Sequence, residues 1–409
     1  MQTLQGNAVI GQSGGPTVVI NQSLVGLIEG CRASSAVRAV YGARRGIQGV
    51  LDEDFVDLGC ETPEDLDAVA HTPCAALRSI RLKPTAEHAS RMLEVFRAHD
   101  VRFFFYIGGN DSAETAHLLS QAAEAADYEL RLFHVPKTID NDLRVTDHCP
   151  GYGSAARFVA QALMGDNQDN RSLGGVKIDV LMGRDAGWLT AASRLARVHE
   201  DDGPHLIYVP ERNFDFDRFL GSVENTVARL GRCVVAVSEG IHDASGNLIV
   251  SSGAADAFGN HQLSGSGALG DILSARVKQA LGAGARVRAD TFGYLQRSYF
   301  GVVSEVDARE AREVGRAAVE AATGGEVPHG SMVILRDADA PGYQARFEVT
   351  ELANVARHTR PLDEMYIDGD DDISASFIDY ALPLVGELPR PGCLAEHPVR
   401  KLLSGPNAR

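Results

Sequence analysis

This 409-residue chain has few of the features that mark disulfide-bonded, zinc-binding or membrane proteins. Its six cysteines lie far apart and form no CxxC pair, so free thiols in a reducing cytoplasm are expected rather than a zinc knuckle or a disulfide framework. No uninterrupted apolar run reaches the roughly 18 residues of a membrane span. The polar first residues lead directly into a strand pattern, which disfavours a signal peptide. We expect a cytoplasmic protein.

Positive charge is also scarce. Lysine and arginine number 39 against 55 acidic residues, a formal net charge of −16. This imbalance argues against a nucleic acid or an acidic membrane as partner, and any site for a small anion must gather its own basic residues. The length suits two domains. An apolar fraction of 44% and a charged fraction of 23% are those of an ordinary globular protein.

Short apolar runs alternate with helical patterns along the chain, which is typical of parallel βαβ units. Strands are predicted at 7–11, 101–107, 131–135, 176–182, 205–209, 233–238 and, as the last of the sheet, 331–336. Helices are predicted at 17–31, from 112, from 152, at 216–230 and at 306–322, where Gly324 and Gly325 provide a C-cap. The pattern predicts an α/β fold with mostly parallel sheets.

The most informative segment, 136–142, follows one of these buried strands and carries Asp140 and Asp142 two positions apart. Open α/β sheets bind ligands at the carboxyl ends of their strands. One carboxylate there can take a proton from a hydroxyl while the other holds a metal ion. Lys137 beside them can neutralise an oxyanion. This combination indicates phosphoryl transfer.

Two glycine-rich turns, at 11–16 and 108–112, each stand between a predicted strand and a predicted helix. Backbone amides at such a turn can cradle phosphate. The first turn has the spacing of neither a dinucleotide-binding loop nor a Walker A loop. The first could equally be a tight structural turn. The second could be a helix N-cap, although a cap explains one polar residue and not three in a row.

Five segments in order resemble motifs of the phosphofructokinase family: 108–112 (GGNDS), 136–142 (PKTIDND), 182–184 (MGR), 238–240 (SEG) and 293–297 (GYLQR). The resemblance spans roughly residues 7 to 335. It implies two similar three-layer α/β lobes, with mostly parallel sheets and the active site in the cleft between them. Residues 1–150 with about 296–350 would bind the phosphoryl donor. Residues 151–295 with about 351–409 would bind a sugar phosphate.

Two positions resemble the pyrophosphate-dependent branch of that family. ATP-dependent members have glycine where this chain has Asp111 and Lys137. The Asp111 carboxylate would fill the space of the ATP α-phosphate and repel it, and the Lys137 ammonium would anchor pyrophosphate. Tyr294 also stands where ATP-dependent members usually have histidine. The resemblance implies reversible phosphorylation of fructose 6-phosphate by pyrophosphate.

The resemblance also implies roles for individual residues. Asp140 would be the general base, aided by Lys137, Thr138 and Arg184. Pyrophosphate would contact Gly14, Gly15, Asn110, Asp111 and Lys137. The sugar phosphate would contact Thr138, Asp140, Met182, Gly183, Arg184, Glu239, Arg288, Tyr294 and Arg297. Mg²⁺ would be held near Asn110 and Asp142. The better-known family pattern has aspartate in place of Asn110, which leaves the direct protein ligands of the metal open.

Further expectations concern partners and alternatives. The partners are small molecules, and a homodimer or homotetramer is expected, with Arg288 or Arg297 reaching across a subunit boundary as in the family. An ATP-dependent kinase, a kinase preferring sedoheptulose 7-phosphate and a non-catalytic regulatory subunit of the same family are alternatives. The fold pattern also allows a dinucleotide-binding oxidoreductase, but no GxGxxG with a downstream acidic residue supports it.

Overall fold

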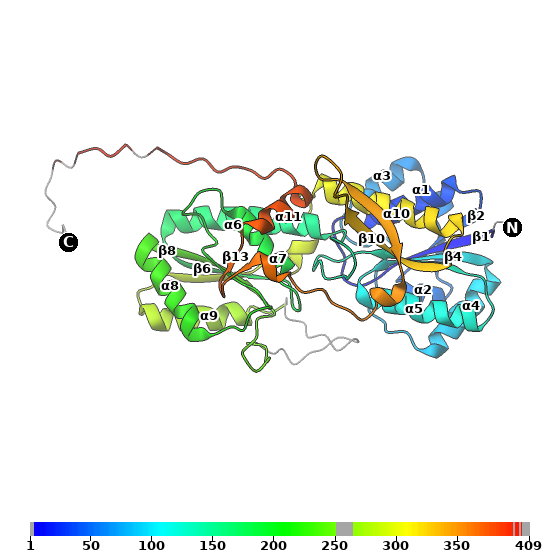
Figure 1. Cartoon of the computed structure of the whole chain (residues 1–409), viewed down its shortest axis with the longest axis horizontal. Coiled ribbons are helices and arrows are strands. Elements are labelled where there is room, and N and C mark those ends of the chain that lie inside the picture. The colour runs from blue at the N-terminus through cyan, green and yellow to red at the C-terminus, as the bar shows by residue number, and fades with distance from the viewer. Residues whose placement is uncertain (1–3, 251–264, 396, 401, 403–409) are drawn as a thin grey trace.

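A computed structural model describes residues 4–250, 265–395, 397–400 and 402. These residues form two lobes that lie side by side, each built on a β-sheet with helices on both faces (Figure 1). No helix within the described ranges combines the length and the apolar character needed to cross a membrane. The fold is α/β with mostly parallel strands, as predicted.

The described part of the first lobe contains a seven-stranded sheet in the order β11-β10-β5-β4-β1-β2-β3. Its inner strands pair in parallel, whereas β3 and β11 pair antiparallel at the two edges. The strands are β1 (Gly6–Gln12), β2 (Val37–Ala43), β3 (Phe55–Asp57), β4 (Val101–Gly108), β5 (Arg131–Pro136), β10 (His329–Arg336) and β11 (Ala345–Thr350).

Helices cover both faces of this sheet because its central strands are apolar on both sides. On β4, Phe103 and Phe105 pack with α1, α3 and α10, whereas Phe104 and Tyr106 pack with α2, α4 and α5. A strand buried on both faces has this nearly continuous apolar sequence. The helices are α1 (Ile20–Ala33), α2 (Ile47–Leu51), α3 (Pro63–Ala70), α4 (Ala86–Ala98), α5 (Asn110–Ala125) and α10 (Glu305–Gly324).

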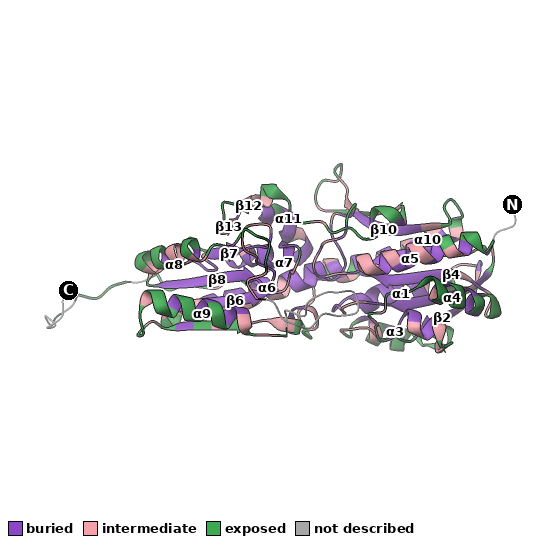
Figure 2. Ribbon diagram, turned by 90° about the horizontal axis from the view of Figure 1, so that it is seen from below, coloured by how far each residue is buried: buried purple, intermediate pink, exposed green. Residues whose placement is uncertain are grey.

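The second lobe has a smaller sheet of four parallel strands within the described residues, in the order β7-β8-β6-β9. The strands are β6 (Gly175–Leu181), β7 (Leu206–Tyr208), β8 (Arg232–Ser238) and β9 (Val287–Thr291). On one face pack α6 (Tyr152–Leu173), α7 (Trp188–Ala191) and α11 (Ser376–Val385), and on the other α8 (Phe216–Leu230) and α9 (Ala268–Leu281). Figure 2 shows the buried strands of both sheets between helices with exposed outer faces.

Short strands and 3₁₀ turns lie in the segments that connect the larger elements. The strands β12 (Ile367–Asp368) and β13 (Asp372–Ile373) form a hairpin beside the second sheet. The chain crosses between the lobes after β5, again before α10, and once more after β11. The 3₁₀ turns are η1 (Leu58–Cys60), η2 (Ala192–Ala196), η3 (Gly293–Arg297), η4 (Leu352–Asn354) and η5 (Glu364–Tyr366).

The predicted strands and helices are all present, although the starts of two helices differ and other elements, among them β2, β9 and α9, were not predicted. Helix α1 begins at Ile20 rather than at residue 17, and α5 begins at Asn110 rather than at Ser112, so Asn110 and Asp111 belong to its first turn. The segment predicted as the last sheet strand, β10, is followed by β11. This edge strand alternates half-buried and exposed residues instead of forming an apolar run, which made it hard to recognise. The glycine cap of α10 is confirmed, with Gly325 left-handed at a φ of 79°.

Candidate active site

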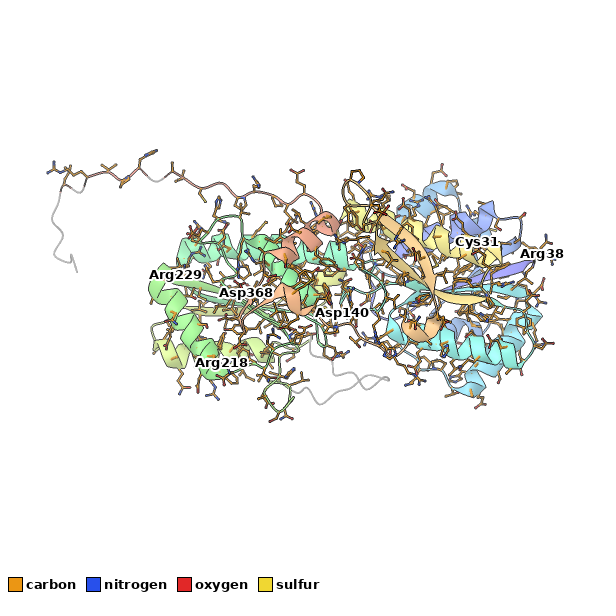
Figure 3. All side chains as sticks on the ribbon, viewed as in Figure 1. Cys31, Arg38, Asp140, Arg218, Arg229 and Asp368 are labelled. Atoms are coloured by element: carbon orange, nitrogen blue, oxygen red, sulfur yellow. The ribbon has the colours of Figure 1, made fainter. Side chains whose placement is uncertain are left out.

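A cavity of about 450 Å³ lies where the carboxyl ends of β1, β4 and β5 face the second lobe. Both lobes contribute to its lining, and Figure 3 places Asp140 between them. The predicted site residues in this lining are Gly14, Gly15, Asn110, Asp111, Lys137, Thr138, Asp140, Asp142, Met182, Arg184, Glu239, Tyr294 and Arg297.

The two glycine-rich turns lie next to each other in the cavity wall. The amide of Ser13, after β1, donates to the Ile107 carbonyl of β4 at 2.9 Å. Gly14 has a φ of +73°, a conformation that favours glycine. At Gly108 a Cβ atom would lie 1.9 Å from the Ser112 hydroxyl oxygen of the same turn and 2.5 Å from the Ser13 hydroxyl oxygen of the other, so a larger residue would force the two turns apart. The glycines therefore allow the first turn of α5 to pack against the turn after β1.

Lys137 connects segment 136–142 to these turns. Its amide donates to the Gly108 carbonyl at 2.9 Å, and its ammonium donates to the Gly15 carbonyl at 2.6 Å. The side chain is 3% exposed. Burial, together with the positive charge of Arg297, lowers the pKa of Lys137 to about 8. The ammonium is thus a desolvated cation at the wall of the cavity.

Asp140 and Asp142 are half-buried and face the same cavity. The amide of Asp140 donates to the Thr138 hydroxyl at 3.1 Å, which shapes the turn. Burial raises the pKa of Asp140, although Arg184 opposes this shift. Burial and the charge of Asp140 raise the pKa of Asp142 to about 7. A carboxylate with a raised pKa is a stronger base for a hydroxyl proton.

The same two carboxylates suit a divalent cation. Oxygen ligands are those that hard cations prefer, and a cation between two desolvated carboxylates would relieve their mutual repulsion. The Asn110 side-chain oxygen accepts from the Asp111 amide at 2.9 Å, so it also serves the first turn of α5. The carboxylates are therefore the stronger candidate ligands.

The second-lobe side of the cavity is built from three loops at the ends of β6, β8 and β9. The Ser238 hydroxyl donates to the Gly183 carbonyl, and the Met182 amide donates to the Gln296 side chain at 3.2 Å. A Cβ atom on Gly240 would lie 1.9 Å from the Arg184 carbonyl oxygen, so this glycine lets two of the loops touch. These contacts hold Arg184 and Glu239 at one edge of the cavity.

Arg297 reaches from η3, which follows β9, to the glycine turn after β1. A Cβ atom on Gly15 would lie 2.4 Å from an Arg297 guanidinium nitrogen. The Arg297 guanidinium also stands over the Tyr294 ring, 4.7 Å from its centroid. Burial, together with the charge of Arg81, lowers the pKa of Arg297. The two arginines and Lys137 concentrate positive charge in an otherwise acidic protein.

All of the predicted site residues lie in the described part of the chain, and two of them lie outside the cavity lining. Gly183 supports Arg184 through its carbonyl, at a φ of +129°. Arg288 is exposed on β9, where its guanidinium donates to the adjacent Val287 carbonyl at 3.1 Å. Its contact with sugar across a subunit boundary stays a prediction. Sequence reasoning missed Arg81 and Thr359, which follow no predicted strand and yet line the cavity.

A separate carboxylate cluster lies at the second sheet. Ligand oxygens of Asp166, Asp179 and Asp290 lie within 4.8 Å of one another. The Lys177 ammonium contacts all three carboxylates, at 3.3 Å from Asp166 and 3.8 Å from Asp179. A cation thus already occupies this cluster, and it is distinct from the pair formed by Asp140 and Asp142.

The fold and the cavity define a phosphotransferase-type site, and the sequence matches the family model "Phosphofructokinase" over residues 7–322. Because this match covers more than half of the chain, the protein belongs to the phosphofructokinase family. The family resemblance seen in the five motifs is thus confirmed.

The chain is also similar to individual members of the family. It is 50% identical over 406 residues to a pyrophosphate–fructose 6-phosphate 1-phosphotransferase of Rhodospirillum rubrum, which covers 98% of this chain and 99% of that protein. A protein of the same name from Halomonas elongata is 40% identical, with 98% of each chain covered. The crystal structure of a pyrophosphate-dependent phosphofructokinase from Marinobacter aquaeolei superposes with a TM-score of 0.83 at 35% identity, covering 95% of this chain and 94% of that one.

Proposed function

We propose that this protein transfers a phosphoryl group from pyrophosphate to the C1 hydroxyl of fructose 6-phosphate, giving fructose 1,6-bisphosphate and phosphate. The observation that carries this proposal is one cavity with Lys137 and two glycine turns on one side, Arg184 and Glu239 on the other, and Asp140 between them. The full-length relatives that bear this activity in their names support the same reaction. We expect the reaction to run in both directions, because the free energies of phosphoryl transfer from pyrophosphate and from fructose 1,6-bisphosphate are comparable.

Asp140 acts as general base in this proposal and takes the proton of the attacking hydroxyl. Its raised pKa favours that step. The Lys137 ammonium and the amides of the glycine turns bind pyrophosphate, while Thr138 and Arg184 stabilise the charge that spreads over the transferred group. Glu239 binds sugar hydroxyls, and Arg297 with Tyr294 binds the sugar phosphate. Catalysis then consists of positioning and electrostatics.

We propose Mg²⁺ as the divalent cation, held by Asp142 with Asp140 and with the Asn110 oxygen nearby. When bound, it neutralises charge on the pyrophosphate oxygens. Asp142 would hold the cation beside the donor, and Asp140 would remain available to accept the proton of the sugar hydroxyl.

Donor choice rests on Asp111 in the first turn of α5. Its side chain lines the cavity, half-buried, directly after Asn110. A carboxylate there takes up the space of the α-phosphate of a nucleotide and repels its charge. Pyrophosphate has no third phosphate and would not reach Asp111. Lys137 gives that smaller donor an anchor in place of the nucleotide.

We further propose that residues 1–150 with about 296–350 form the donor lobe and residues 151–295 with about 351–409 the sugar lobe. A homodimer or homotetramer would let Arg288 enter a partner's sugar site. The exposed side chains of Leu295, Tyr299 and Phe300, at 57%, 46% and 72%, support an interface beside β9.

We propose a cytoplasmic location as well. The six cysteines are unpaired, which suits a reducing cytoplasm.

A product assay that crosses two donors with two acceptors tests the proposal. Pyrophosphate and ATP are each combined with fructose 6-phosphate and with sedoheptulose 7-phosphate, in the presence of Mg²⁺, and the bisphosphates are quantified. We expect the highest kcat/KM for pyrophosphate with fructose 6-phosphate and little product with ATP. Equal turnover with ATP would refute the donor assignment, and turnover with no combination would refute the proposed reaction.

A further inference from the structure

Arg360 lies in the segment between η4 and η5, the third connection between the lobes, and its side chain fills the back of the catalytic loop. One guanidinium nitrogen donates to the Thr146 carbonyl at 2.6 Å. The other donates to the carbonyls of Asn141 and Asp147 at 3.0 and 2.9 Å. The Arg360 amide donates to the Asp142 carbonyl at 2.7 Å. One residue thus binds four carbonyls of residues 141–147.

This loop needs such support because its backbone is strained. Asn141 and Val145, neither of them glycine, have φ values of 56° and 70°. A β-branched residue in this left-handed region is costly and persists where surrounding contacts hold it. Val145 is itself 50% exposed and supplies little packing. The convergence of the carbonyls on Arg360 therefore fixes the path of the chain on both sides of Asp142.

Arg360 also contacts the sugar-side loop. Its guanidinium lies over the Trp188 ring, 4.4 Å from the centroid, and its carbonyl accepts from the Trp188 indole at 3.3 Å. Trp188 begins α7 four residues after Arg184 and is 1% exposed. Through this stack, Arg360 joins the loop of the two aspartates to the loop of Arg184.

We propose that Arg360 is a positioning residue that sets the separation between the carboxylates of the donor lobe and Arg184 of the sugar lobe. The inference rests on the proposed function, since it concerns the alignment of the base with the sugar hydroxyl. In-line transfer tolerates little misplacement, because a shift of about 1 Å can reduce turnover on the order of a hundredfold. A planar guanidinium serves the converging carbonyls and the indole together, which an ammonium cannot do.

The test uses Arg360→Lys and Arg360→Ala in the full chain, with Arg32→Lys and Arg32→Ala as matched controls. Arg32 likewise donates to loop carbonyls, those of Leu58 and Glu61 at 2.7 and 2.8 Å, but at η1 in the first lobe and outside the cavity lining. Steady-state kinetics with pyrophosphate and fructose 6-phosphate are measured for each protein, together with the melting temperature. Trp188, the sole tryptophan, reports the stack through its fluorescence.

For Arg360→Lys we expect kcat to fall roughly ten- to a hundredfold, with both KM values changed less than about threefold and a shifted Trp188 emission. Guanidinium chloride at tens of millimolar should restore part of the activity of Arg360→Ala, whereas equal urea should not. The Arg32 variants should keep wild-type kcat and emission. If Arg360→Ala does not fold, Arg360→Lys decides alone.

A folded Arg360→Lys protein with wild-type kcat would overturn the inference. The inference would also fail if Arg360→Lys and Arg32→Lys lost the same fraction of kcat for the same decrease in melting temperature, because the effect would then be one of stability alone. The wild-type measurement separates this result from a failure of the proposed function. A wild-type protein that does not use pyrophosphate refutes both statements, whereas an active wild type with an unaffected variant refutes the positioning role alone.

Discussion

The proposed function assigns the phosphoryl donor to one wall of the cavity and the sugar phosphate to the other, and these two walls are built in different ways. The donor wall consists of backbone: glycine turns after β1 and β4, held together by main-chain bonds, with Lys137 as a buried cation. The sugar wall consists of side chains, Arg184 and Glu239, on loops fixed through Ser238 and Gln296. Backbone amides and an ammonium suit a compact polyanion, while longer side chains suit hydroxyls spread over a larger ligand.

This difference teaches which changes each wall tolerates. The donor wall depends on glycines that admit no Cβ atom, such as Gly108, so its shape is set by close approach. The sugar wall depends on side-chain length and charge, so its selectivity can change by single substitutions. Asp140 lies where the walls meet and should be the residue whose loss affects both halves of the reaction.

The largest effect is expected for Asp140→Asn. Removing the base should reduce kcat by roughly two to four orders of magnitude with smaller changes in either KM. Initial rates of fructose 1,6-bisphosphate formation measure this, with circular dichroism as a control for folding. Turnover near that of the wild type in a folded variant would remove Asp140 from the role.

Arg297→Ala should weaken the binding of the sugar phosphate. Loss of a half-buried, charge-assisted contact costs about 1.5–3 kcal/mol, or roughly ten- to a hundredfold in the KM for fructose 6-phosphate. Arg288→Ala is the companion variant: it should raise the same KM if β9 faces a partner's site. Sedimentation of both proteins controls for their oligomeric state. An unchanged KM in both variants would place the sugar phosphate elsewhere.

Asp111→Gly should alter the donor wall with a smaller effect on the natural reaction. ATP-dependent turnover should appear, because both bulk and repulsion are removed, while pyrophosphate turnover falls by less than about tenfold. Adding Lys137→Gly should then weaken pyrophosphate use further. These residues line one cavity, so their effects need not add. Continued inactivity with ATP in Asp111→Gly would contradict the steric and electrostatic explanation.

The smallest effect concerns stability behind the catalytic loop. His148 bonds Asp147 at 2.9 Å and Glu310 of α10 at 2.6 Å. Burial disfavours its charge, but these two carboxylates outweigh burial and raise the pKa of His148. The stability that charged His148 contributes is therefore present below its unfolded pKa of about 6.5 and is lost as pH rises through the higher folded value.

Thermal melts of the wild type and of His148→Gln between about pH 6 and pH 9 measure this. The wild type should exceed the variant by most at the acidic end, with the gap narrowing by a few degrees as pH rises. A gap that stays constant across this range would show that His148 is neutral in the folded protein.

Much of the fold could be predicted from the sequence because buried parallel strands such as β4 are continuous apolar runs. The edge strand β11 could not be predicted, since its residues alternate between half-buried and exposed and do not form an apolar run. Most of the candidate site was likewise predictable, because glycine turns and paired aspartates follow strand ends. Arg81 and Thr359 were not, because they reach the cavity from irregular segments that only the folded chain brings there.

By itself, the sequence determined the α/β class and the family, and it predicted phosphoryl transfer at segment 136–142, because local composition carries strand, turn and charge signals. The tertiary structure alone decided that Arg297 meets Gly15, that Arg288 lies outside the cavity lining, and that Arg360 lies between the loop of residues 141–147 and Trp188. These contacts join residues more than a hundred positions apart or on different lobes. Their proximity follows from the way the folded lobes bring the carboxyl ends of their strands together, which no local pattern encodes.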